Sequence, residues 1–175
     1  MTSQQVLRQR VWTEAELQAS RLQYYEPRKK CVMARTINIP VDVEMTIEIL
    51  SAHEGDVMIY DPEGGARRPD IGSYDHWPVQ RDLFNKTYKI WDDLRWMPND
   101  AELHLILYGC RPYYKYKGVW AMQLEKPVLI QSLESPKPVE VPPGRWLIIG
   151  SEGEPYHMQD RKFRERYQVT TQQQS

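Results

Sequence analysis

The sequence predicts an α+β protein made of two homologous, β-rich halves, each a small antiparallel sheet with a short helix, packed pseudo-symmetrically. The main observation is a repeat: a glycine-flanked apolar run at residues 55–64 is echoed at residues 144–153. Each run is followed by the pattern Gln-x-x-x-Phe-x-x-x-Tyr, at residues 80–88 and 159–167. The chain has only two Phe, and both fall at matching points of this pattern. Such ordered matches indicate an internal duplication.

The first half begins with a helix and continues with strands. Residues 13–16, Thr-Glu-Ala-Glu, form a capping-box pattern, which predicts a short N-terminal helix. Residues 31–39 and 41–50 are rich in β-branched side chains, and the second run alternates apolar and polar positions, so we expect two strands. A third strand is expected at residues 57–60, after a glycine turn.

A loop and a helix are expected at the end of the first half. Residues 67–73 are predicted to form an exposed loop. The spacing of apolar residues after Pro78 favours a short helix that begins at this proline, because proline needs no hydrogen-bond partner in a first turn. Phe84 and Tyr88 then lie on one helical face, and we expect that face to pack onto the sheet.

The second half repeats this plan. We expect strands at residues 118–124, 128–133 and 145–149, a proline-rich connection at residues 135–144, and a terminal helix at residues 160–167. The bridge between the halves is expected to contain a strand at residues 103–108.

These elements predict two domains and a tail. The first half, with the N-terminal helix, spans residues 1–91, the second spans residues 92–169, and residues 170–175 are a polar tail expected to be disordered. Each half is close to the size at which a hydrophobic core becomes marginal. We therefore expect the halves to share a buried interface.

The second copy resembles a known family. Residues 141–150 are followed by Gly153-Glu-Pro-Tyr156 and by the Phe163-x-x-x-Tyr167 pair. This order resembles the PGDYG-like domain of bacteria and phages, whose pattern is Pro-Gly-Asp-aromatic, a strand, Gly-Glu-x-Tyr-Pro and Phe-x-x-x-Tyr. Arg145 and His157 replace the Asp and Pro of that pattern. The family is largely uncharacterised, so the resemblance implies tandem copies of one architecture and no activity.

Composition limits the classes of function. Lys and Arg number 23 against 24 Asp and Glu, and the net charge of −1 argues against a globally basic nucleic-acid binder. The sequence has no long apolar run and no signal-peptide pattern, so we expect a cytoplasmic protein without membrane contact. Cys31 and Cys110 have no metal-ligand spacing, and we expect both thiols to be reduced.

The aromatic content favours a binding or assembly module over an enzyme. Eleven Tyr and six Trp accompany the two Phe, and aromatic rings with a polar group are enriched at interfaces. The expected partner is another protein or a second copy of the chain. The predicted contact residues are Trp91, Trp96, Tyr113, Tyr114, Lys115, Tyr116, Lys117 and Trp120.

Two alternative functions remain open. The alternation of Tyr and Lys at residues 113–117 is also typical of single-stranded nucleic-acid binding, where rings stack on bases and cations contact phosphates. An enzyme with a cleft between the halves is the other alternative, and its candidate ligand-binding residues are Arg67, Arg68, His76, Arg145 and His157. No catalytic residue, metal or cofactor is predicted, since the four His lack paired metal-ligand spacing. His76 is expected to make a hydrogen bond within its loop.

Overall fold

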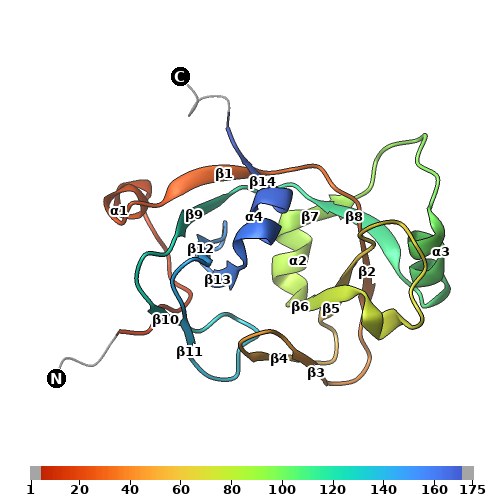
Figure 1. Cartoon of the computed structure of the whole chain (residues 1–175), viewed down its shortest axis with the longest axis horizontal. Coiled ribbons are helices and arrows are strands. Elements are labelled where there is room, and N and C mark those ends of the chain that lie inside the picture. Colours follow the sequence, from red (N-terminus) through yellow and green to blue (C-terminus); the bar gives the residue numbers. More distant parts are fainter. Residues whose placement is uncertain (1–4, 171–175) are drawn as a thin grey trace. The chain divides into compact units, whose positions relative to one another are not determined.

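Antiparallel β-sheet dominates the chain, which a computed structural model describes over residues 5–170 (Figure 1). Within these residues, fourteen strands accompany four short α-helices, and the expected α+β class is confirmed. The strands form two five-stranded sheets and two two-stranded sheets. The chain divides into two compact units, and each unit contains one of the five-stranded sheets. No helix in the described range is long and apolar enough to cross a membrane.

Unit 1 combines the two ends of the chain. It consists of residues 1–28, 44–49 and 116–175, and its large sheet has the strand order β13-β12-β9-β1-β14. The bounds of these strands are β1 Gln23–Pro27, β9 Val119–Gln123, β12 Trp146–Ile149, β13 Pro155–Met158 and β14 Tyr167–Val169. Helix α1 (Glu14–Ala19) precedes β1, and helix α4 (Asp160–Arg166) joins β13 to β14. Strands β10 (Val128–Ile130) and β11 (Val139–Val141) pair separately.

Unit 2 consists of residues 29–43 and 50–115. Its large sheet has the order β6-β5-β2-β8-β7. The bounds of these strands are β2 Val32–Thr36, β5 Val57–Asp61, β6 Asp75–Val79, β7 Tyr88–Ile90 and β8 Arg111–Lys115. A 3-10 helix (Ile71–Ser73) precedes β6, helix α2 (Arg81–Thr87) joins β6 to β7, and helix α3 (Asp100–Leu107) precedes β8. Strands β3 (Val41–Glu44) and β4 (Ile49–Ala52) form a hairpin, whose tip at residues 44–49 is counted with unit 1.

The two large sheets have the same plan but take one strand from an unexpected place. In each sheet a helix joins the two edge strands: α4 joins β13 to β14, and α2 joins β6 to β7. The strand next to the last one, β1 or β8, follows a short helix, α1 or α3. Strand β1 precedes β2 along the chain, yet it pairs with β9, whereas β8 precedes β9 and pairs with β2. The compact units therefore cut across the predicted halves at residues 1–91 and 92–169.

Helices α2 and α4 each contribute one Phe that packs against a sheet. Phe84 and Phe163 are buried, and each stacks on a Tyr four residues later. The Phe84–Tyr88 ring centroids are 4.9 Å apart, and the Phe163–Tyr167 centroids are 5.1 Å apart. Both Phe side chains pack onto their sheets as expected. Tyr88 and Tyr167, however, are the first residues of β7 and β14 and not members of the helices.

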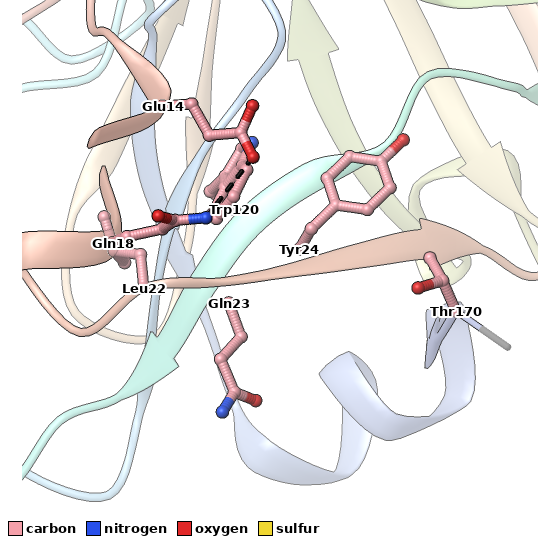
Figure 2. Close-up of a pocket in the computed structure, with 7 residues that line it drawn as sticks. All are labelled: Glu14, Gln18, Leu22, Gln23, Tyr24, Trp120 and Thr170. Atoms are coloured by element: carbon pink, nitrogen blue, oxygen red, sulfur yellow. Dashed lines mark hydrogen bonds between the residues drawn. The ribbon is translucent and has the colours of Figure 1, made fainter. Parts of the chain in front are cut away.

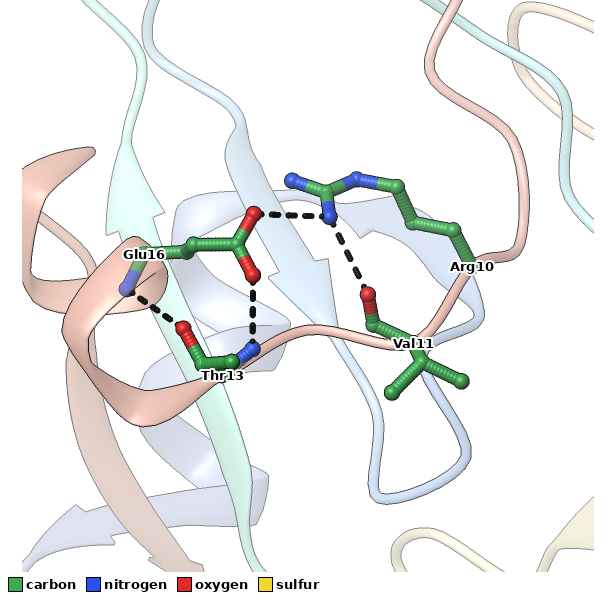
Figure 3. Close-up of polar contacts among 4 residues, drawn as sticks. All are labelled: Arg10, Val11, Thr13 and Glu16. Atoms are coloured by element: carbon green, nitrogen blue, oxygen red, sulfur yellow. Dashed lines mark hydrogen bonds and ion pairs between the residues drawn. The ribbon is translucent and has the colours of Figure 1, made fainter.

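The predicted capping box starts helix α1. The Glu16 amide donates to the Thr13 hydroxyl over 3.1 Å, and the Thr13 amide donates to the Glu16 carboxylate over 3.0 Å (Figure 3). Arg10 adds an ion pair to the same carboxylate, with 3.0 Å between Nη1 and Oε2. These bonds satisfy amides that have no partner within the helix.

The strand expected at residues 103–108 is wrong, because helix α3 occupies this segment. A second capping box explains the difference: the Glu102 amide donates to the Asn99 side chain over 2.8 Å, and the Asn99 amide donates to the Glu102 carboxylate over 2.9 Å. Ala101 and Leu105, one helical turn apart, are both fully buried. Helical packing therefore explains the apolar residues that suggested a strand.

Other boundaries also differ from expectation: the strand expected at 128–133 ends at Ile130, and the expected connection at 135–144 contains β11. Residues 41–50 form two strands, since a turn closed by the Met45 amide and the Glu48 carbonyl interrupts them. Pro78 lies in β6, an edge strand where a missing N–H is tolerated, and α2 starts three residues later. Of the predicted tail, Thr170 is buried, and residues 171–175 lie outside the described residues.

Candidate functional site

The predicted aromatic and basic residues fall into both units. Tyr113, Tyr114 and Lys115 lie on β8, which pairs with both β2 and β7 and is therefore an interior strand. All three side chains are half-buried. Tyr113 meets Phe84 edge-on, with ring centroids 5.0 Å apart at 75°. Lysines are common on exposed edge strands, but β8 is not an edge strand.

Trp91 and Tyr114 share one cation. Their rings meet at 83° with centroids 5.9 Å apart, and the Lys29 ammonium lies 4.7 Å from the Tyr114 centroid and 5.4 Å from the Trp91 centroid. Lys29 also forms an ion pair with Asp92, and the hydrogen bond that its ammonium donates to this carboxylate raises the pKa of Lys29. The cation is thus held by contacts within the chain.

The remaining members of the predicted set take different roles. Trp96 donates its indole N–H to the buried Glu102 carboxylate over 3.3 Å, which ties the preceding loop to the start of α3. Tyr116 and Lys117 lie in unit 1, with the ammonium 5.5 Å from the ring centroid. Trp120, on β9, packs against Tyr24 with centroids 5.7 Å apart.

The predicted cleft residues separate into two groups. Arg67, Arg68 and His76 belong to unit 2, and Arg68 is tied to its own loop by a 3.0 Å bond to the Ser73 carbonyl. His76 lies on strand β6 and not in a loop, and its Nδ1 is 2.7 Å from the Tyr74 carbonyl oxygen. Its ring also stacks on Tyr60.

Arg145 and His157 lie together in unit 1, within a buried polar network. Arg145 Nη1 is 3.4 Å from His157 Nδ1, and His157 Nε2 hydrogen-bonds to Glu48 at the tip of the β3–β4 hairpin. The hydroxyl of Ser135 donates to the other Glu48 oxygen over 2.6 Å. Because a guanidinium can only donate, Nδ1 of His157 must accept and Nε2 must carry the hydrogen that Glu48 receives.

The electrostatics of this network favour an ionised Glu48. Burial acts to raise the pKa of Glu48, but hydrogen bonds from His157 and Ser135 outweigh it, and the pKa lies below its ordinary value. Burial lowers the pKa of Arg145, and the Glu48 charge opposes that effect. The ionised Glu48 carboxylate is therefore stabilised by hydrogen bonds from His157 and Ser135 and by the charge of Arg145.

This arrangement is not that of an activated nucleophile. An activated serine requires a base such as histidine on its hydroxyl, whereas Ser135 contacts Glu48 and the hydroxyl of Ser132. The His157 and Glu48 side chains are only 8% and 10% exposed. Within residues 5–170, no group of three or more His, Cys, Asp or Glu side chains is placed to hold a metal ion.

Sequence reasoning missed a set of exposed apolar side chains on α3 and the loop before it. We call this the α3 surface, and it consists of Leu94, Met97, Leu103, Ile106, Leu107 and Tyr108. Leu94 is fully exposed, Met97 is 85% exposed and Leu107 is 75% exposed. The opposite face of α3, with Ala101 and Leu105, is buried in unit 2, so this helix carries apolar side chains on its exposed face as well. The capping-box pattern at Asn99 was the sequence signal that could have revealed helix α3.

Comparison with known proteins adds no assignment. No protein-family model matches the chain, and neither the curated proteins nor the solved structures contain a match. The function is therefore argued from the geometry of the described residues.

Proposed function

We propose that this chain is a non-catalytic assembly module that associates with a second copy of itself through the α3 surface. The supporting observation is the exposure of its six apolar residues, which together equal about four whole side chains, or on the order of 400 Å². The largest apolar patch on a monomeric protein is typically about 300–600 Å², and such patches are often functional. The apolar part of one side of a standard interface is about 450 Å², so the α3 surface matches the requirement of a stable dimer.

Charge at the two ends of α3 supports a second copy as the occupant. Asp100 is exposed at the start of the helix, and Arg111 is exposed just after its end. In an antiparallel pair of α3 helices related by a twofold axis, Asp100 of each copy would face Arg111 of the other. The helix dipoles would also oppose each other favourably.

Trp96, one of the predicted aromatic residues, would support this surface from within unit 2. Trp96 anchors the loop that bears Leu94 and Met97 by its bond to Glu102. Residues 113–117 remain a predicted contact for single-stranded nucleic acid, and an enzyme remains the other alternative. Neither is favoured by the geometry, since ring faces of β8 are paired internally and the His157 network is buried.

We also infer that the chain is a tandem duplication whose copies have exchanged their first helix and strand. Tyr25 on β1 meets Phe163 edge-on at 5.0 Å, and Tyr113 on β8 meets Phe84 in the same way at 5.0 Å. The capping boxes of α1 and α3 match as well. The pseudo-symmetric packing of the halves and the resemblance to PGDYG-like domains stay predictions.

Sedimentation velocity across a concentration series tests the assembly proposal. We expect the wild-type chain to dimerise and the double variant Leu103→Lys/Leu107→Lys to remain monomeric, because lysine would place charge in the apolar contact. The control is Val11→Lys, which changes an exposed apolar residue in unit 1. Circular dichroism would confirm that all variants are folded. A wild-type chain that stays monomeric throughout, or a double variant that dimerises as the control does, would contradict the proposal.

A further inference from the structure

A pocket in unit 1 is lined by aromatic rings and one carboxylate. It has a volume of about 490 Å³ and is lined by Glu14, Gln18, Leu22, Gln23, Tyr24, Trp120 and Thr170 (Figure 2). Small-molecule sites commonly have volumes of roughly 300–1,000 Å³. The pocket is thus large enough for a small ligand or for one side chain of a peptide.

Sheet register explains why two rings stand together here. Tyr24 on β1 and Trp120 on β9 are directly opposite each other in the antiparallel pair, so both side chains project from the same face. Their centroids are 5.7 Å apart at an interplanar angle of 59°. Figure 2 shows both rings on the side of β1 that faces Glu14, with Gln23 on the other side.

Gly118 fixes the position of the Tyr24 ring. A Cβ atom at this glycine would lie 2.1 Å from the Tyr24 hydroxyl oxygen, so the ring packs directly on the backbone of residue 118. Both rings are half-buried and keep part of their faces open to the pocket. The aromatic wall is therefore built before any ligand arrives.

The charge of the pocket is negative. Glu14 is the one charged residue among the seven described residues that line it. Gln18 donates its amide to Glu14 Oε1 over 3.3 Å, which orients the carboxylate from the same helix. Burial, and then the charge of Glu26, raise the pKa of Tyr24, so its phenol stays neutral and its ring keeps a negative face.

We propose that this pocket binds an alkylammonium group, with its cationic head against Tyr24 and Trp120 and with Glu14 as its counter-ion. Aromatic faces attract ammonium groups by cation–π interaction, and an adjacent carboxylate adds the opposite charge. The buried Leu22 supplies an apolar contact for the alkyl chain. The ammonium group belongs either to a free amine or to a lysine side chain of a peptide, and the chemistry of recognition is the same.

Titration of the full-length chain with n-butylammonium chloride tests this proposal, with the Trp120 indole N–H signal in NMR spectra as the readout. Sodium chloride at equal ionic strength corrects for salt effects, and 1-butanol provides a neutral molecule of the same shape. We expect n-butylammonium to bind at least about tenfold more tightly than 1-butanol, because two rings and a carboxylate recognise charge. Equal binding of the alcohol would overturn the proposal.

Matched variants identify the counter-ion. Glu14→Gln is expected to weaken n-butylammonium binding about threefold or more, whereas Glu140→Gln, an exposed carboxylate on β11 of the same unit, should leave it unchanged. Equal effects of the two variants would overturn the assignment of Glu14. Both exposed substitutions are expected to preserve folding, which the dispersion of the spectra reports.

A second ligand identifies the source of the ammonium group. Nα-acetyl-lysine methylamide should bind as tightly as n-butylammonium if the pocket takes a peptide lysine, and clearly more weakly if it takes a free amine. Both results support an ammonium site, whereas absence of a Trp120 shift with either compound overturns it. The pocket lies in unit 1 and α3 lies in unit 2. Failure of the ammonium proposal therefore does not contradict dimerisation through the α3 surface, and a monomeric protein does not contradict the ammonium proposal.

Discussion

Glu48 and His157 are 109 residues apart in the sequence, yet their side chains hydrogen-bond in the interior of unit 1. Glu48 lies at the tip of the β3–β4 hairpin, and His157 lies on β13. The contact joins residues 44–49, the tip of the hairpin, to strand β13 of the large sheet of unit 1. Its energetic weight can be measured directly.

Removal of the Glu48 side chain should destabilise the protein. Glu48→Ala removes the acceptor of the buried His157 N–H and leaves Ser135 with only Ser132 as a hydroxyl partner, and we expect a loss of about 3 kcal/mol in the free energy of unfolding. Urea unfolding measures this loss. Glu140→Ala, at an exposed position of the same unit, should change the stability by less than about 0.5 kcal/mol. Similar losses for both variants would show that the network contributes little.

The contribution of Glu48 should depend on pH. Its pKa in the folded protein lies below the ordinary value of 4.5, since hydrogen bonds from His157 and Ser135 outweigh the effect of burial. A lowered carboxyl pKa stabilises the fold above the unfolded-state value, and this stabilisation disappears as the pH falls through the folded-state value. The difference in stability between wild type and Glu48→Gln should therefore be constant near neutral pH and shrink below pH 4.5. A difference that stays the same into the acid range would contradict this account.

Fragments should follow the compact units rather than the sequence repeat. Residues 29–115 contain every strand of the large sheet of unit 2, whereas residues 92–175 lack β1, which separates β9 from β14 in unit 1. We expect the first fragment to unfold cooperatively on heating and the second to show no cooperative transition. Addition of a peptide of residues 1–28 to residues 116–175 should restore a transition. Cooperative unfolding of residues 92–175 alone would disprove the exchange.

Gly118→Ala should destabilise unit 1. The new Cβ would collide with the Tyr24 ring, whose hydroxyl oxygen would lie only 2.1 Å away, and we expect a cost of about 2 kcal/mol in the free energy of unfolding. Gly72→Ala is the matched control, because its Cβ would meet only Asp70 at an ordinary 3.4 Å. Thermal unfolding of both variants distinguishes them, and equal stability would show that Tyr24 moves without cost.

Both thiols should react slowly in the folded protein. Burial raises the pKa of Cys110 to about 11 from 9.0 and raises the pKa of Cys31 as well. For Cys110, the reactive thiolate is then about a hundredfold less abundant than in an ordinary thiol at mildly alkaline pH. Iodoacetamide labelling followed by mass spectrometry should be slow without urea and fast with it. Equally fast labelling in both conditions would contradict the prediction.

Local signals predicted several elements well. The capping boxes are contained in four consecutive residues, so Thr13 and Glu16 could be assigned from sequence, and Asn99 and Glu102 could have been assigned by the same rule. The segment that follows Asn99 was instead predicted as a strand, because its leucines alternate in a short window. A short apolar run does not distinguish a strand from a buried helix.

The candidate site residues could not be predicted to the same degree. Arg145 and His157 are found together, but the sequence offered no reason to join them to Glu48, since no periodicity links a hairpin tip to a distant strand. The exposure of Leu103 and Leu107 also depends on which helical face the rest of unit 2 covers. Burial is a property of the packed chain.

The sequence by itself determined the class of the fold and several local turns. Gly55 and Gly144 show this: both have positive φ angles, of 92° and 93°, which the glycine-flanked repeat anticipates. Only the tertiary structure decided that β1 pairs with β9 and β8 with β2. Strands β1 and β8 have similar sequences, so local preference cannot decide which of them pairs with β2 and which with β9. That choice depends on the free energy of the whole packed chain.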